Sequence, residues 1–383
     1  MERCSNQLLP LNFESNGVRR RLGRTQEHQS SIDQRQRRPL SLDEDGTHRC
    51  SCNRWGGVAG RSAWSRSLRL ATRGFLNLGV ANRIVACLER HGAPMLTKSQ
   101  IEHYREFGYL VVPGALPRDL LASLRATVDK LIAGAANLIS HTDIYDLEDT
   151  HTPAAPRVRR IKTPHKHFPF FAELTRNPCI TDTLAQILGS DIRLHGSKLN
   201  MKSAGYGAAV EWHQDWAFYP HTNDDVLATG IYLDDCGMEN GPLLVVPGSH
   251  RGPVYDHHAN GYFTGAMDPE LETAGYDRAV PLVGEAGSMT IHHARLVHGS
   301  ALNSSSKPRR LLLHEYAAAD AWPLMGVANF EDFLHRIVRG KPTLEPRLVP
   351  LPVRMPLPPS PYQGSIYENQ KANPKRFFAK AAE

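Results

Sequence analysis

The chain has 383 residues, 41% of them hydrophobic, and no stretch approaches the roughly 18 uninterrupted apolar residues of a membrane span, so we expect a soluble globular protein. Residues 1–95 carry 16 Arg, no Lys and 8 acidic residues, whereas the other 288 residues carry 29 basic and 31 acidic side chains. The net charge of +6 therefore belongs to the N-terminal part, and the near-neutral remainder argues against the basic groove of a nucleic-acid-binding protein.

The N-terminal part is predicted to lie outside the folded body. Residues 1–60 are rich in Arg, Gln and Ser and predict a disordered tail, and residues 61–95 predict a helical extension. The Arg-rich, Lys-free composition has some transit-peptide character, but the acidic run Asp43–Asp45 argues against one. No basic start followed by a long apolar core marks a secretory signal, so we expect a cytoplasmic protein.

The six cysteines support an intracellular location. Four of them lie in residues 1–95, and the other two, Cys179 and Cys236, are far apart in the sequence. This distribution does not resemble a disulfide framework. Cys50 and Cys52 have no second cysteine pair that would complete a zinc site, so we expect none there.

The folded body is predicted to begin near Leu96 with helices. Thr97 and Gln100 have the spacing of a capping box, and Gly108 is placed to end the helix that follows. The expected elements are a helix over 97–107, a strand over 109–112, and helices over 117–133 and 179–188.

From residue 192 onwards, short β-prone runs alternate with Gly, Pro, Asn and Asp. Many short strands with regular turns predict a sandwich or barrel, flanked by the N-terminal helices in an α+β fold, and we assign 96–340 to this domain. Residues 342–361 hold eight prolines, so 341–383 are predicted to form a Pro-rich extended arm. The expected strands cover 192–201, 210–218, 226–233, 241–246, 287–292 and 310–316.

The segment His213-Gln214-Asp215 is the first with chemical content. Residues i and i+2 of a strand share a face, so His213 and Asp215 project together while Gln214 turns away. An imidazole and a carboxylate on one face supply two ligands of a 2-His-1-carboxylate triad, which leaves the opposite face of the metal open for O2. A His-x-Asp motif is common, however, and taken alone it fits a hydrogen-bonded surface pair better.

A second segment, His298-Gly299-Ser300, follows a β-prone run and lies 85 residues beyond His213. This separation is compatible with a second histidine on a distant strand that folds back across the barrel. Arg309 lies eleven residues after His298, where its guanidinium could bind a carboxylate bidentately, and Ser300 could add a hydroxyl. Taken alone, this segment fits an ordinary turn with a solvated Arg better.

Together the two segments resemble the phytanoyl-CoA dioxygenase family, in which His-x-Asp is followed by His-Gly-Ser and by an Arg eleven residues after that His. The likeness covers roughly residues 97–320 and includes the turn-rich block 240–250. The resemblance implies a double-stranded β-helix, that is, a cupin-like jelly-roll barrel. It also implies Fe(II), 2-oxoglutarate and O2, and hydroxylation of an unactivated carbon of a small organic or acyl substrate with release of succinate and CO2.

By position, the resemblance implies that His213, Asp215 and His298 are the metal ligands. It also implies that Arg309 and Ser300 hold the distal carboxylate of 2-oxoglutarate. Halogenating relatives carry a small residue in place of the metal carboxylate, so the presence of Asp215 favours hydroxylation. Further basic candidates for contacts with the cosubstrate or the substrate are Lys162, Lys198 and Lys202.

Two other interpretations stay open. A cupin-like metalloenzyme could use the same three ligands without 2-oxoglutarate, although the position of Arg309 argues against it. A non-catalytic jelly-roll binding protein could keep only the fold, although the presence of Asp215 argues against that. His292 and His293 are expected to have structural or supporting roles rather than to bind metal. The sequence identifies neither the substrate, beyond a small molecule, nor the oligomeric state.

Overall fold

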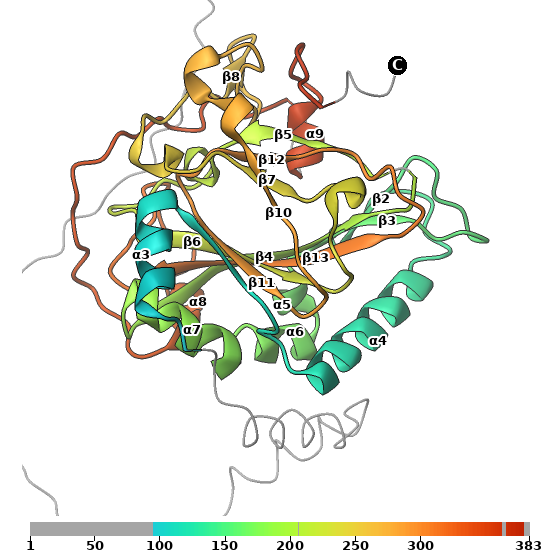
Figure 1. Ribbon diagram of the computed structural model, residues 1–383, viewed down its shortest axis with the longest axis horizontal. Helices are drawn as coiled ribbons and strands as arrows, with labels where there is room; N and C mark the ends of the chain where they lie inside the picture. Colours follow the sequence, from blue (N-terminus) through green and yellow to red (C-terminus); the bar gives the residue numbers. More distant parts are fainter. Residues whose placement is uncertain (1–94, 206, 362–364, 379–383) are drawn as a thin grey trace, which may run out of the picture. The chain divides into compact units, whose positions relative to one another are not determined.

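The computed structural model describes residues 95–378 except 206 and 362–364 (Figure 1). The predicted tail over 1–60 and nearly all of the extension over 61–95 lie outside the described residues. The described part holds two facing β-sheets with helices packed mainly against the larger one. None of its helices is long and apolar enough to cross a membrane.

The first described helix, α3 (Lys98–Phe107), begins at the expected capping box. The Thr97 hydroxyl accepts a hydrogen bond from the Gln100 backbone N–H, and the Gln100 side chain accepts one from the Thr97 backbone N–H. Gly108 ends the helix at a φ of 80°, a left-handed conformation that favours glycine. The chain then enters β1 (Tyr109–Val112), as predicted.

Two longer helices also follow the predicted pattern. Helix α4 (Arg118–Gly134) matches the helix predicted over 117–133 and extends one residue further, through Gly134. Helix α7 (Pro178–Leu188) begins where the Asn177 side chain accepts a hydrogen bond from the Cys179 N–H. The shorter helices are α5 (Pro164–His167), α6 (Pro169–Leu174), α8 (Phe330–His335) and α9 (Ile366–Gln370).

The larger sheet has eight strands in the order β1-β11-β6-β13-β4-β3-β2, with β14 beside β4, and its neighbouring strands are antiparallel. At its centre Leu312 lies opposite Leu199 on one side and Ile231 on the other. Besides β1, its strands are β2 (Tyr145–Leu147), β3 (Val158–Lys162), β4 (Ile192–Lys202), β6 (Val226–Tyr232), β11 (Met289–His293), β13 (Arg309–Ala318) and β14 (Ile337–Arg339).

The smaller sheet has the order β10-β7-β12-β5 and faces the larger one (Figure 1). Its strands are β5 (Val210–His213), β7 (Leu243–Val245), β10 (Val280–Leu282) and β12 (His298–Ser300), and β8 (His258–Ala259) pairs with β9 (Tyr262–Phe263) in a separate ribbon. The predicted jelly-roll fold is confirmed, but the described strands form separate sheets rather than one closed barrel.

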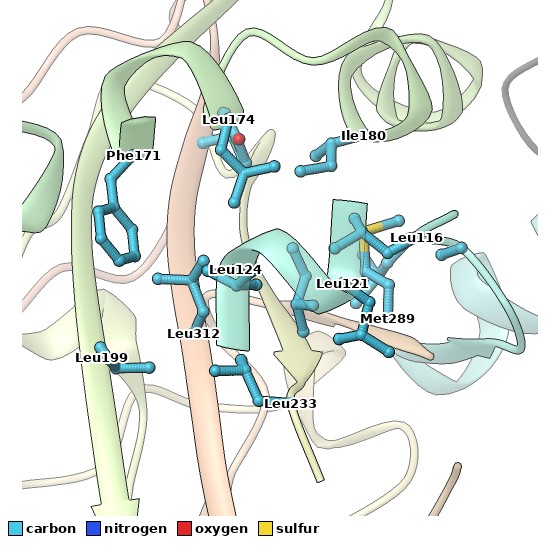
Figure 2. Packing of buried hydrophobic residues seen from close by; sticks show 14 of the residues in the cluster. Leu116, Leu121, Leu124, Phe171, Leu174, Ile180, Leu199, Leu233, Met289 and Leu312 are labelled. Carbon is cyan, nitrogen blue, oxygen red and sulfur yellow. The ribbon is translucent and has the colours of Figure 1, made fainter. Parts of the chain in front are cut away.

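Side chains alternate across the larger sheet. Leu312 belongs to the apolar cluster beneath α4, α6 and α7, where it packs with residues such as Leu124, Phe171 and Ile180 (Figure 2). Its neighbours Leu311 and Leu313 line a cavity between the two sheets. The helices therefore hold the outer face of the sheet, and the inner face is left for the functional site.

The boundaries of two predicted strands differ from those observed. The strand predicted over 210–218 ends at His213, and a 3₁₀ turn over Asp215–Ala217 follows. The strand predicted over 287–292 is observed as β11 (Met289–His293), and a turn then closes through a hydrogen bond from the Leu296 N–H to the His293 carbonyl. The chain thereby crosses from the larger sheet to the smaller one before His298.

The described C-terminal part holds little regular secondary structure. Residues 342–361 form neither helix nor strand, as their prolines predicted. The short helix α9 (Ile366–Gln370) was not anticipated, and it lies close to β5 (Figure 1).

Candidate metal centre and adjoining cavity

Three ligand-type side chains, two from the smaller sheet and one from the turn that follows β5, meet between the sheets. His213 ends β5, Asp215 begins the following 3₁₀ turn, and His298 begins β12. One potential ligand atom from each lies within 4.8 Å of the others, and all three residues are buried. Nε2 of His213 and Nε2 of His298 each lie 3.9 Å from a carboxylate oxygen of Asp215, so the site has the size of a single metal ion.

Backbone carbonyls orient both imidazoles. Nδ1 of His213 lies 2.8 Å from the carbonyl oxygen of Glu211, and Nδ1 of His298 lies 2.8 Å from that of Leu296. A proton on Nδ1 is donated to each carbonyl, which leaves the Nε2 lone pairs free. Two neutral imidazoles aimed at one carboxylate form the donor set of a 2-His-1-carboxylate triad.

Gln214 turns away from the triad, as its position between the two ligands predicted. Its amide group donates to the carbonyl oxygens of Pro253 and Arg295 and accepts from the Tyr255 N–H. Its backbone N–H donates to Nε2 of His257 at 2.9 Å. The residue that joins the two candidate ligands is therefore held through both its side chain and its backbone.

The electrostatics of the site favour the forms that bind metal. Burial lowers the pKa of His213 to about 4 and that of His298 well below its usual value, so both imidazoles stay neutral. Burial alone would raise the pKa of Asp215, but the Lys198 charge and a hydrogen bond from His292 hold it well below the usual range. The carboxylate is therefore ionised at neutral pH.

His292 lies beside the triad, whereas His293 does not. Nε2 of His292 lies 3.5 Å from Asp215, and its ring centroid lies 4.6 Å from that of His298. His293 instead faces Asp224 and packs against His250 outside the cavity. Of the two histidines, only His292 can support the carboxylate directly.

Arg309 lies across the cavity from the smaller sheet, on the first residue of β13. It is 2% exposed, and one terminal nitrogen donates to the Gly241 carbonyl at 2.7 Å, but its Nε has no hydrogen-bond partner. A buried guanidinium with a free N–H needs an acceptor, and a carboxylate fits it well. Ser300 lines the same cavity from β12.

Gly299 separates His298 from Ser300 at a crowded point of β12. A Cβ at this position would lie 2.9 Å from the Phe378 ring and 3.1 Å from the Val210 carbonyl oxygen. Only glycine fits here without displacing its neighbours, because 3.1 Å is a close approach to backbone.

The three predicted lysines have different surroundings. Lys198 lines the cavity, and its ammonium lies 2.8 Å from Glu315. Lys202 is buried beside the Ser300 and Ala301 carbonyls rather than in the cavity lining. Lys162 lies 3.2 Å from Asp146 on the neighbouring strand, away from the cavity, so the prediction for Lys162 gains no support from its position.

The sequence did not reveal several cavity residues. Ile366 and Tyr367, from the C-terminal helix α9, line the cavity together with Arg309 and the triad. A five-residue helix has no measurable periodicity, so no local signal indicated their role. The other lining residues outside the predicted set are Asn200, Val210, Leu243, His292, Leu311 and Leu313.

Sequence comparison agrees with this geometry. The protein-family model Phytanoyl-CoA dioxygenase (PhyH) matches residues 104–311. A probable alpha-ketoglutarate-dependent hypophosphite dioxygenase of Stutzerimonas stutzeri is 39% identical over 285 residues, which is 73% of this chain and 99% of the relative. An L-proline trans-4-hydroxylase of Streptomyces griseoviridis is 34% identical and covers 42% of this chain and 67% of its own. An ectoine dioxygenase of Bordetella bronchiseptica is 29% identical, with 57% of this chain and 74% of its own length covered.

Structural comparison agrees on the fold. The crystal structure of EctD from S. alaskensis with bound Fe superposes with a TM-score of 0.51 and 24% identity, covering 70% of this chain and 92% of that one.

Proposed function

Because the chain belongs to the phytanoyl-CoA dioxygenase family and is an Fe(II)- and 2-oxoglutarate-dependent dioxygenase, we propose that His213, Asp215 and His298 are its iron ligands. The observation that carries this proposal is the convergence of three buried ligand atoms within 4.8 Å. Two neutral imidazoles and one ionised carboxylate fit Fe(II), since this donor set leaves metal positions open for a chelating cosubstrate and O2.

Arg309 and Ser300 are the proposed partners of the distal carboxylate of 2-oxoglutarate. The unpartnered Nε of Arg309 supports this role, because a bidentate carboxylate would satisfy it. Lys198 is proposed to contact the cosubstrate or the substrate from β4.

The balance of charges in the cavity supports a dianionic cosubstrate. The negative charge of Asp215 offsets that of Arg309, and Glu315 offsets Lys198, so these four side chains contribute no net charge. A divalent metal ion adds two positive charges to this buried space, and a dicarboxylate neutralises them.

When bound, iron and 2-oxoglutarate use O2 to hydroxylate the substrate, with release of succinate and CO2. The chain contributes orientation and exclusion of water. His292 supports the Asp215 carboxylate, and Leu243, Leu311 and Leu313 form apolar walls beside the triad. These walls keep the reacting groups apart from solvent.

We propose a small polar molecule as the substrate. The relatives whose names indicate their substrates act on hypophosphite, L-proline and ectoine. Hypophosphite is the first compound to test, because the hypophosphite dioxygenase relative matches this chain over 99% of its own length.

An anaerobic titration tests the assignment without knowledge of the substrate. Purified protein is titrated first with Fe(II) and then with 2-oxoglutarate while the visible absorption is recorded. We expect a charge-transfer band that is absent in Asp215→Ala and weakened in Arg309→Ala. Iron binding without the band would favour a metalloenzyme that does not use 2-oxoglutarate, and the absence of iron binding would favour a jelly-roll binding protein.

We also propose that the protein acts inside the cell. Both cysteines of the described region, Cys179 and Cys236, are buried free thiols, which suits a reducing compartment.

The near-neutral charge of residues 96–383 supports a small-molecule substrate rather than a nucleic acid.

A further inference from the structure

The C-terminal segment 365–378 reaches the cavity although it lies beyond the family match, which ends at residue 311. Tyr367 is 6% exposed and lines the cavity together with Arg309 and Ser300. The wall beside the proposed carboxylate site is therefore built by a part of the chain that the family pattern does not include.

Tyr367 also lines a second, outer pocket of about 300 Å³. Its ring thus lies between this outer pocket and the inner cavity of about 40 Å³. The outer pocket carries three basic side chains, of which Arg159 lies over the Tyr367 ring with its guanidinium carbon 4.8 Å from the ring centroid. Its charged lining residues are Asp149, Arg159, Glu211, Lys371 and Arg376.

The segment is anchored to β5, the strand that ends in His213. The Gln370 side chain accepts from the Glu211 N–H and donates to the Gly265 carbonyl, both at 3.0 Å. The Glu211 carboxylate accepts from the backbone N–H groups of Phe377 and Phe378. These contacts hold the middle and the end of the segment, so the helix that carries Tyr367 is anchored to the same strand that carries the proposed metal ligand His213.

We propose that Tyr367 is a cosubstrate-binding residue that encloses 2-oxoglutarate against Arg309 and separates it from the outer pocket. This inference rests on the proposed function. Exclusion of water by the Tyr367 ring strengthens the ion pair between Arg309 and a carboxylate, because that pair then lies in a medium of low dielectric constant.

The test is an anaerobic titration of the full-length, Fe(II)-loaded protein with 2-oxoglutarate, in which the charge-transfer band reports binding. Stopped-flow displacement of the bound 2-oxoglutarate gives its dissociation rate. Tyr367→Ala should raise the Kd for 2-oxoglutarate about tenfold, mainly through faster dissociation, and leave the affinity for Fe(II) unchanged. Lys375→Ala is the matched control: Lys375 lies in the same segment but is partly exposed and paired with Glu270, so its replacement should change neither affinity.

Equal Kd values for Tyr367→Ala and the wild type would overturn the inference while leaving the proposed function intact. Absence of the band in the wild type would instead overturn the proposed function. Should Tyr367→Ala fail to fold, hydrogen exchange of the wild type decides: 2-oxoglutarate should slow amide exchange across 365–378 in the Fe(II)-loaded protein, and unchanged exchange there would reject the inference.

Discussion

The backbone N–H of Gln214 donates a hydrogen bond to Nε2 of His257, and the Nδ1 of the same imidazole lies 3.0 Å from the Tyr255 carbonyl. His257 is thereby fixed as the neutral tautomer with its proton on Nδ1. Because Gln214 joins the two proposed ligands His213 and Asp215, His257 sets the backbone geometry of the metal site without facing the metal.

Replacement of His257 by Ala should weaken metal binding. Loss of a group that orients the ligands costs about 10–100-fold in metal affinity, and we expect a value near the lower end because the Gln214 side chain keeps its own contacts. Anaerobic Fe(II) titration measures the effect. His258→Ala is the control, since His258 contacts Asp256 and Leu357 instead, and equal losses in both variants would contradict a specific role of His257.

Replacement of Lys198 alone should lower the free energy of unfolding more than replacement of Lys198 and Glu315 together. Their side chains are mostly buried and lie 2.8 Å apart, so Lys198→Met leaves a carboxylate without its partner near Asp215. Loss of one partner of a buried pair costs about 3–5 kcal/mol, whereas neutralisation of both costs less. Urea unfolding should therefore find the double variant Lys198→Met/Glu315→Gln more stable than Lys198→Met. A double variant that loses the sum of the single losses would exclude this coupling.

The metal-free protein should lose stability as the pH falls from 7 to 5. Burial lowers the pKa of His213 to about 4 and those of His221, His257 and His314 to about 3. A histidine side chain in the unfolded chain has a pKa of about 6.5. The unfolded state therefore binds more protons between these values, and the free energy of unfolding decreases as the pH falls through this window.

Each such histidine should contribute on the order of 1–2 kcal/mol to the decrease between pH 7 and pH 5. Urea unfolding at several pH values measures the slope. His314→Gln should flatten it, because glutamine carries no charge in either state and position 314 lies outside the cavity. A slope that is unchanged in this variant would argue against His314 as a contributor.

Truncation of the core beneath the larger sheet should affect stability and not the metal site. Leu124 is fully buried in α4, so Leu124→Ala should lower the free energy of unfolding by about 2–5 kcal/mol. Lys130→Ala, on the exposed side of the same helix, should change it by less than about 0.5 kcal/mol. Fe(II) affinity should match the wild type in both variants, and a loss in Leu124→Ala would show that the helix layer and the cavity are coupled.

The convergence of residues on the candidate metal site could be predicted from sequence because their spacing is short and chemically specific. His213 and Asp215 are two residues apart, and extended backbone at Gln214 keeps their side chains on one side even though the strand ends at His213. The strand boundaries were less accurate, because a β-prone run does not reveal where the chain leaves one sheet for the other. The strand predicted over 210–218 is an example: it ends at His213, and a 3₁₀ turn over Asp215–Ala217 follows.

The parts that could not be predicted depend on long-range contacts. Tyr367 reaches the cavity only because Gln370 binds the backbone of β5, more than 150 residues earlier in the chain. Lys162 was a reasonable candidate by residue type, but Asp146 on the paired strand holds its ammonium elsewhere. Neither relationship has a signature in the local sequence.

The crowding around Gly299 limits how the site can be redesigned. Any side chain there would meet the Phe378 ring and the Val210 carbonyl, so saturation mutagenesis at this codon should yield almost only glycine among active clones. A library intended to broaden substrate scope should therefore keep Gly299 fixed. Diversity is better placed at Leu243, Leu311 and Leu313, whose side chains line the cavity without binding the metal.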